Sequence, residues 1–169
     1  ISNPYDLPEG RTLASLSGRF DLKETLRPTS DIVALMTLEH QTGFIDRAAA
    51  LNVTGSDAAL NDLVSYMTYG DEVALPGPVA GNSGFAAEFA ARGPRDSQGR
   101  SLRDFDLKTR LFRYPLSYMI YSAAFDALKP EIKTTLWRKL YDTLKTRPAG
   151  NDAIAIAAAT RPGLPDYWK

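Results

Sequence analysis

The residue with the widest chemical range in this sequence is its single histidine, His40. An imidazole can act as a general base, as a proton carrier or as a ligand to a metal or haem iron. His40 stands in the mainly apolar run Leu35–Phe44, between a glutamate and a glutamine. Two interpretations follow. His40 is a buried neutral imidazole, bonded to a backbone carbonyl or to a neighbour such as Gln41, or it is a ligand to a cofactor carried elsewhere.

Most other site chemistries lack their residues in this chain. Without cysteine there is no thiolate metal site, no cysteine nucleophile and no covalent haem attachment through the chain's own side chains. No serine stands in a strand-turn-helix elbow, and the glycines at 77, 81 and 84 lack the lysine and hydroxyl of a phosphate loop. The sequence therefore predicts no independent catalytic site, and the question of an enzyme stays open.

Three arginines, Arg103, Arg110 and Arg113, lie close in sequence to Asp104 and Asp106. They could form an anion site, but the mixture of both signs favours solvated ion pairs.

His40 needs a helix to position it. The Thr29-Ser30-Asp31 run has the hydroxyls and the acid that cap a helix N-terminus, and the helix is predicted to run to about Asn52. Steps of three and four place one stripe of residues on a single face: Val33, Met36, His40, Phe44 and Arg47. An adjoining stripe holds Ala34, Leu38, Gln41 and Ile45. His40 is thus predicted to face the interior or a packed interface.

The remaining sequence predicts an all-α fold, an irregular orthogonal domain of about five or six helices with long Pro/Gly loops. Residues 1–28 are interpreted as an extended arm anchored by Phe20, Leu22 and Leu26, and residues 29–169 as one helical domain. Further helices are predicted from Ser56 to a stop at Gly70, around Phe85 and Phe89, over a buried segment 116–125, from Pro130, and over 152–160. The loop 70–84 is expected to be functional or pinned to a partner.

Charge and hydropathy exclude two classes of partner. Twenty basic residues balance twenty acidic residues, so no overall field attracts nucleic acid. No window approaches the roughly 20 apolar residues of a membrane span. The chain begins at Ile1 and not at methionine, which indicates a processed product or part of something longer.

Six stretches together resemble the C-terminal part of a family of exported bacterial proteins related to c-type cytochromes. They are distributed over nearly the whole chain from Ser30 onward: Ser30–Thr42, Phe89–Pro94, Gly99–Asp104, Leu111–Pro115, Ser117–Ser122 and Leu164–Trp168. In such proteins a region with C-x-x-C-H haem attachment lies upstream. Where the family pattern tends to place a second histidine after Glu-His-Gln-Thr, this chain has Gly43-Phe44-Ile45-Asp46, so only His40 carries over as a ligand.

The resemblance implies a periplasmic or otherwise exported setting and a cytochrome-bearing partner chain or segment in a hetero-complex. It implies haem c carried by that partner, with His40 as a candidate axial ligand and Met36 and Phe44 as a dry wall beside the haem. The first hypothesis is therefore an accessory helical domain or subunit of an exported electron-transfer protein. The alternative is a purely structural subunit or interaction domain with no cofactor.

Overall fold

In the computed structural model of the protein, which describes residues 31–168, every named element is a helix. The all-α prediction with five or six helices is thereby confirmed. The α-helices are α1 (Ile32–Thr54), α2 (Asp57–Met67), α3 (Phe85–Ala91), α4 (Ala123–Asp126), α5 (Pro130–Lys145) and α6 (Gly150–Thr160). Two 3-10 helices are η2 (Tyr118–Tyr121) and η3 (Asp166–Trp168). The predicted arm, residues 1–28, lies outside the described residues.

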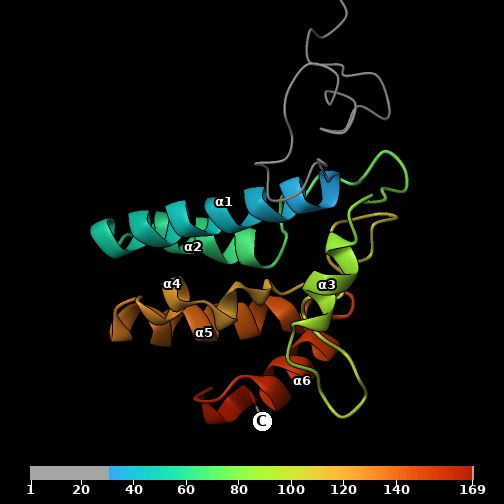
Figure 1. The fold of residues 1–169 in the computed structure, drawn as a ribbon. Helices are drawn as coiled ribbons and strands as arrows, with labels where there is room; N and C mark the ends of the chain where they lie inside the picture. Colours follow the sequence, from blue (N-terminus) through green and yellow to red (C-terminus); the bar gives the residue numbers. More distant parts are fainter. Residues whose placement is uncertain (1–30, 169) are drawn as a thin grey trace, which may run out of the picture.

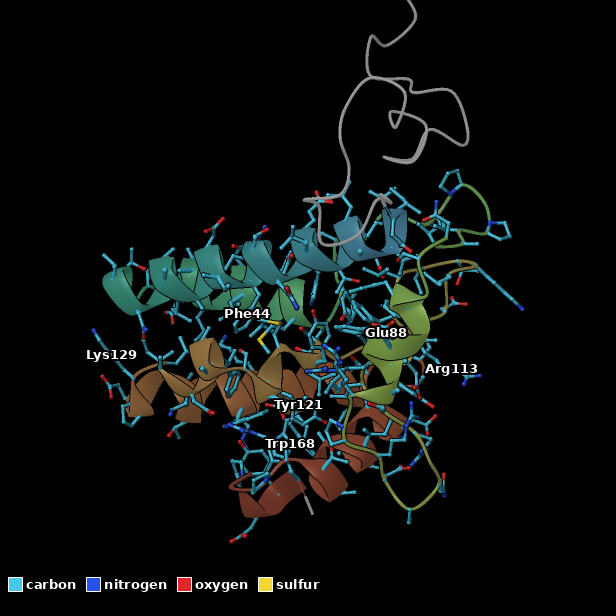
Figure 2. The ribbon with its side chains drawn as sticks, viewed as in Figure 1. Phe44, Glu88, Arg113, Tyr121, Lys129 and Trp168 are labelled. Atoms are coloured by element: carbon cyan, nitrogen blue, oxygen red, sulfur yellow. The ribbon has the colours of Figure 1, made fainter. Side chains whose placement is uncertain are left out.

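The helices lie in layers, with α1 and α2 side by side along one edge of the molecule (Figure 1). The next layer is formed by α4 and α5, and α6 follows with η3 packed against it. One cluster of buried side chains joins these layers, from Phe44 on α1 through Phe125 and Trp137 to Trp168 near the C-terminus (Figure 2). None of the described helices is both long and apolar enough to cross a membrane.

The α1–α2 hairpin follows from its capping residues. The carboxylate of Asp31 accepts hydrogen bonds from the backbone N–H groups of Val33 and Ala34 and so begins α1. Gly55 ends α1 in the left-handed conformation at φ 59°. Ser56 then caps α2 through Ala59. Both helices lie where the sequence predicts them.

The residue that ends α2 in the left-handed conformation differs from the predicted Gly70. The left-handed residue is Tyr69, at φ 55°, and not Gly70. Gly70 is needed for close approach, because a Cβ there would lie 2.3 Å from the Ser65 side-chain oxygen and 3.3 Å from its backbone oxygen. A bulky residue at positive φ is strained and is held there by its surroundings.

The loop 70–84 is pinned, mainly to the start of α1. Asp31 accepts from the backbone N–H groups of Asn82 and Ser83 and from the Ser83 hydroxyl at 2.7 Å. Gly81 permits this contact, since a Cβ there would lie 2.5 Å from the Asp31 carboxylate. Further along, the N–H of Leu75 donates to Thr109 and that of Val79 to Leu107. One side chain thus caps a helix and fastens a loop.

We expect Asp31→Ala to lower the free energy of unfolding by about 2 kcal/mol, because it removes both a cap and the loop contacts. Ser56→Ala is the matched control: it removes one exposed cap bond and should cost about 0.5–1 kcal/mol. Burial raises the pKa of Asp31, but hydrogen bonds from Ser83, Ala34 and Val33 together bring it below its ordinary 3.8. The stabilisation is therefore present above about pH 4 and lost below it. Urea titrations of both variants at pH 7 and pH 3 measure this; equal losses for the two variants would contradict it.

The predicted buried helix over 116–125 is wrong in form, although the segment is buried. Ser117 caps the short η2 by accepting from the N–H of Met119, and Ser122 caps α4 by accepting from Phe125. Each serine has extended backbone, so the chain restarts its helix twice within nine residues. The break places Ser117 beside α1.

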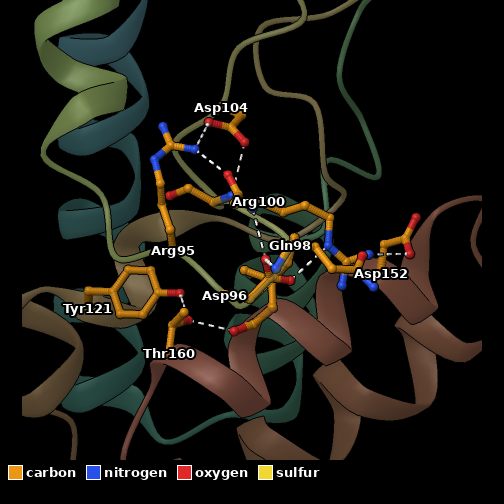
Figure 3. A network of polar contacts seen from close by, with 11 residues as sticks. Arg95, Asp96, Gln98, Arg100, Asp104, Tyr121, Asp152 and Thr160 are labelled. Carbon is orange, nitrogen blue, oxygen red and sulfur yellow. Dashed lines mark hydrogen bonds and ion pairs between the residues drawn. The ribbon is translucent and has the colours of Figure 1, made fainter.

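A polar network ties the loop between α3 and η2 to α6 (Figure 3). Arg100 forms ion pairs with Asp96 and with Asp152 of α6, each at 2.8 Å. The hydroxyl of Tyr121 lies 2.6 Å from that of Thr160 at the end of α6. Two contacts therefore hold this region to α6, one from Arg100 in the loop and one from Tyr121 at the end of η2.

Candidate functional site

His40 lies at the middle of α1 and is only 7% exposed. Phe44, one turn later, is fully buried and stacks on Phe125 of α4 with ring centroids 6.5 Å apart. Met36, one turn earlier, is partly buried against the same core. The predicted stripe is therefore an inward face, and its three candidate site residues follow one another along it.

A serine far away in the sequence completes the site. The Nε2 atom of His40 lies 2.7 Å from the Oγ atom of Ser117, which is fully buried. The same hydroxyl accepts from the N–H of Met119, and the Ser117 N–H donates to the Met67 carbonyl. His40 and Ser117 thus join α1, the end of α2 and η2 at one point.

Four aromatic rings surround the imidazole. Tyr66 stacks on it at 5.2 Å with an interplanar angle of 10°. The rings of Tyr69, Phe112 and Tyr118 lie 5.3 to 5.8 Å from it. The Tyr66 hydroxyl donates to the His40 carbonyl, and Gly43 makes room for it, because a Cβ there would lie 2.3 Å from the hydroxyl. These rings leave the imidazole little access to water.

Burial lowers the pKa of His40 from 6.5 to about 4, since a charged imidazole loses its hydration here. His40 is therefore neutral at pH 7. Burial also raises the pKa of Tyr69 well above its ordinary value, with Glu72 adding to the effect. The Tyr69 hydroxyl lies near Ser117, which lowers its pKa in part, but the contact falls short of good hydrogen-bond geometry. A low-dielectric environment thus extends around the His40–Ser117 pair.

We expect a single imidazole NMR signal, because the chain has one histidine, and we expect it to titrate near pH 4 and not near 6.5. As the pH is lowered, the imidazole of the unfolded chain becomes protonated near pH 6.5, before that of the folded chain. The free energy of unfolding should therefore fall between pH 6.5 and 4, by up to about 3 kcal/mol from this group alone, and no further below pH 4. His40→Gln removes the titrating group and should flatten this part of the pH profile. A signal that titrates at 6.5 in the folded protein would contradict the buried arrangement.

A pocket of about 260 Å³ opens beside the imidazole, between α1, α2 and the following loop. Its lining residues are His40, Arg47, Asp62, Tyr66, Tyr69, Asp71, Glu72 and Leu111. Most of its charges are already paired: Arg47 contacts Asp62 at 3.1 Å and lies over the Tyr66 ring, and Arg110 contacts Glu72 at 3.0 Å. The volume is below the roughly 300–1,000 Å³ of pockets that hold drug-sized ligands.

Arg103 and Arg110 do not converge on an anion site. Arg110 pairs with Glu72, and Arg103 lies over the rings of Phe89 and Tyr118. Asp104 pairs instead with Arg95 at 3.1 Å. Ion pairing is the correct interpretation for Arg110, but with a partner from the loop 70–84 that sequence proximity does not indicate.

Ser117 and His40 have the atoms of a catalytic nucleophile–base pair, but a substrate cannot reach the serine. A catalytic serine must meet a substrate carbonyl, and Ser117 has no exposed surface. The pair instead satisfies two buried polar groups and holds three elements together.

In this arrangement the Nε2 atom of His40 is bonded to Ser117, and iron could bind that atom only in place of the Ser117 hydroxyl. Within residues 31–168 no group of three or more histidine, aspartate or glutamate side chains is placed to hold a metal ion. The axial-ligand hypothesis for His40 therefore stays a prediction that requires the α1–η2 contact to open.

The outward face of α1 carries a second feature. Leu35, Leu38, Ile45 and Val53 are 59%, 54%, 46% and 85% exposed, and Thr42 and Ala49 between them are also exposed. At 3.6 residues per turn these six positions fall within an arc of about 80°, nearly opposite the buried face. We name this set the outer stripe. The sequence predicts that Leu38 and Ile45 share an adjoining stripe of the helix, but it does not predict that this stripe faces outward.

Comparison with known proteins identifies no relative. No family model, no curated protein and no solved structure matches this chain.

Proposed function

We propose that this chain is a non-catalytic interaction domain that assembles with another protein through the outer stripe of α1. The exposed leucines carry the proposal. A surface helix ordinarily turns polar residues to water, whereas α1 is apolar on its outward face as well as on the face that it buries. A helix that is apolar on both sides is typical of one that lies between two packed surfaces.

The proposed setting is an exported, cytochrome-linked assembly, as the sequence resemblance implies. In such an assembly the chain supports a larger protein by packing, and the electron-transfer chemistry belongs to the partner. The His40–Ser117 pair then serves to fix α1 against η2, so that the outer stripe is presented on a rigid helix.

Size-exclusion chromatography with light scattering on natively purified material tests the proposal. We expect a species larger than the 18.5 kDa of the chain alone. Leu35→Asp with Leu38→Asp should return the chain to its monomer mass without lowering its melting temperature, because both residues are exposed. Val73→Asp is the matched control, since Val73 is 86% exposed but lies outside α1, and it should leave the assembly intact. A monomer from native material would overturn the proposal.

The second candidate is the supply of His40 to a haem that the partner carries. The observation in its favour is that His40 lines the pocket beside the α1–α2 hairpin. Visible absorption of the assembly tests it, because loss of an axial imidazole shifts the Soret band and the reduction potential. A spectrum unchanged in His40→Ala, together with a lower melting temperature, would reject the ligand role.

A further inference from the structure

The outer stripe has the spacing of a helix-pairing seam. Its first five positions, 35, 38, 42, 45 and 49, advance by alternating steps of three and four, the rhythm of the a and d positions in a two-helix coiled coil. From Leu35 to Val53 the stripe is about 27 Å long at 1.5 Å per residue. An occupant that matches this shape is a single helix of about five turns lying along α1.

The charges beside the stripe have one sign. Glu39 and Asp46 are exposed, stand seven residues apart and flank the seam on the same edge, which we name the acidic edge. Neither forms an ion pair with any residue in the described part of the chain. The opposite edge is uncharged, with the half-buried Ala34 and Gln41. In paired helices these flanking positions determine which partner is accepted.

A second copy of the chain does not satisfy this edge. In an antiparallel pair the acidic edge of one α1 faces the acidic edge of the other, which is repulsive. In a parallel pair it faces the uncharged residues of the opposite edge. Neither arrangement provides opposite charge, and the acidic edge also opposes binding to an anionic membrane surface.

We infer that the outer stripe docks one amphipathic helix of a partner protein, whose apolar seam is flanked by lysine or arginine that pairs with Glu39 and Asp46. This inference rests on the proposed function and names the chemistry of its partner. The leucines provide the buried area, and the acidic edge selects the partner's sequence and sets its register along α1.

Two synthetic peptides test the charge selection. Each is a helix of about 20 residues with leucine at its seam positions, one with lysine and one with glutamate at the flanking positions. Fluorescence anisotropy with the full chain, residues 1–169, should show the lysine peptide binding about ten-fold tighter, with the difference shrinking at high salt. Glu39→Lys with Asp46→Lys should reverse the preference.

The variants separate the two levels of the proposal. If Leu35→Asp with Leu38→Asp abolishes binding of both peptides while the wild-type chain binds them equally, the interaction domain stands and the basic partner is rejected. If neither peptide binds the wild-type chain, the helix-docking inference is rejected. A lysine peptide that binds the wild type and the Leu35→Asp/Leu38→Asp variant equally binds elsewhere, which also rejects it.

Cysteines introduced one at a time can show what covers the outer stripe, because the natural chain has no cysteine that would react as well. Leu38→Cys should react quickly with an alkylating reagent in the isolated chain, as should Val73→Cys outside the stripe. The lysine peptide should protect Leu38→Cys and leave Val73→Cys unprotected. Slow reaction of Leu38→Cys at every dilution would show that the chain covers its own stripe, and protection that grows with concentration would show a second copy. Either result overturns the inference.

Discussion

Gly150→Ala is expected to lower the free energy of unfolding by at least about 3 kcal/mol, enough to reduce the melting temperature by roughly 6–12 °C in a protein of this size. A Cβ at Gly150 would lie 1.8 Å from the Leu144 backbone oxygen and 2.7 Å from its carbonyl carbon. Both are main-chain atoms in the last turn of α5, so no side chain can rotate away. The change must separate the ends of α5 and α6.

Gly77→Ala is the control for this prediction. A Cβ at Gly77 would meet no atom within 4 Å, and Gly77 has no positive φ, so alanine there should change stability by less than about 0.5 kcal/mol. Thermal unfolding of the two variants under one buffer condition gives the comparison. Similar melting temperatures would mean that the α5–α6 junction relaxes far more than its backbone contacts suggest.

Most helices of the fold could be predicted, because each carries its own local signals. Asp31 and Ser56 cap α1 and α2, Pro130 begins α5, and the apolar periods of α1 and α5 appear as buried faces. These signals depend on residues within one or two turns of each other. They need no knowledge of the rest of the chain.

The departures occur where a short-range rule allows two interpretations. The apolar run 116–125 is compatible with one buried helix, but Ser117 and Ser122 each offer a hydroxyl to a backbone N–H two or three residues later and so restart the helix. The serines themselves were the signal for this break. Gly70 and Gly150 are two further cases in which a local rule allows two interpretations. Each glycine allows another part of the chain to pack closely against its Cα, while the residue before it, Tyr69 or Ala149, adopts the left-handed conformation.

The candidate site was half predictable. Helical spacing places His40 on an inward face, but its partner Ser117 lies 77 positions away and is brought to it only by packing of η2 against α1. The rings around it come from α2, from Tyr69 just after α2 and from the segment 112–118. No local pattern specifies that meeting. The outward orientation of Leu35 and Leu38 was not predictable either. Two faces of α1 are apolar, and local sequence does not determine which of them packs into the core.

Phe112→Ala should have the largest effect on the site and on the fold together. Phe112 has no exposed surface, and its ring contacts those of His40, Tyr69, Phe89, Phe105 and Tyr118 at 5.1 to 6.1 Å. Removing it leaves a cavity at the centre of this cluster and should cost about 3–5 kcal/mol. Because burial alone lowers the pKa of His40, water entering that cavity should raise the pKa from about 4 toward 6.5.

The matched control makes the same chemical change at the margin of the cluster. Phe85 is partly exposed and, among the described residues, its ring stacks only on Phe89, so Phe85→Ala should cost about 1–2 kcal/mol and leave the titration of His40 unchanged. Chemical denaturation and the single imidazole signal, measured on both variants, report stability and site separately. If Phe112→Ala is destabilised while His40 still titrates near pH 4, then Tyr66 and the Ser117 contact are sufficient to exclude water from the imidazole. That result would move the cause of the lowered pKa from the aromatic cluster as a whole to the α1–α2 hairpin.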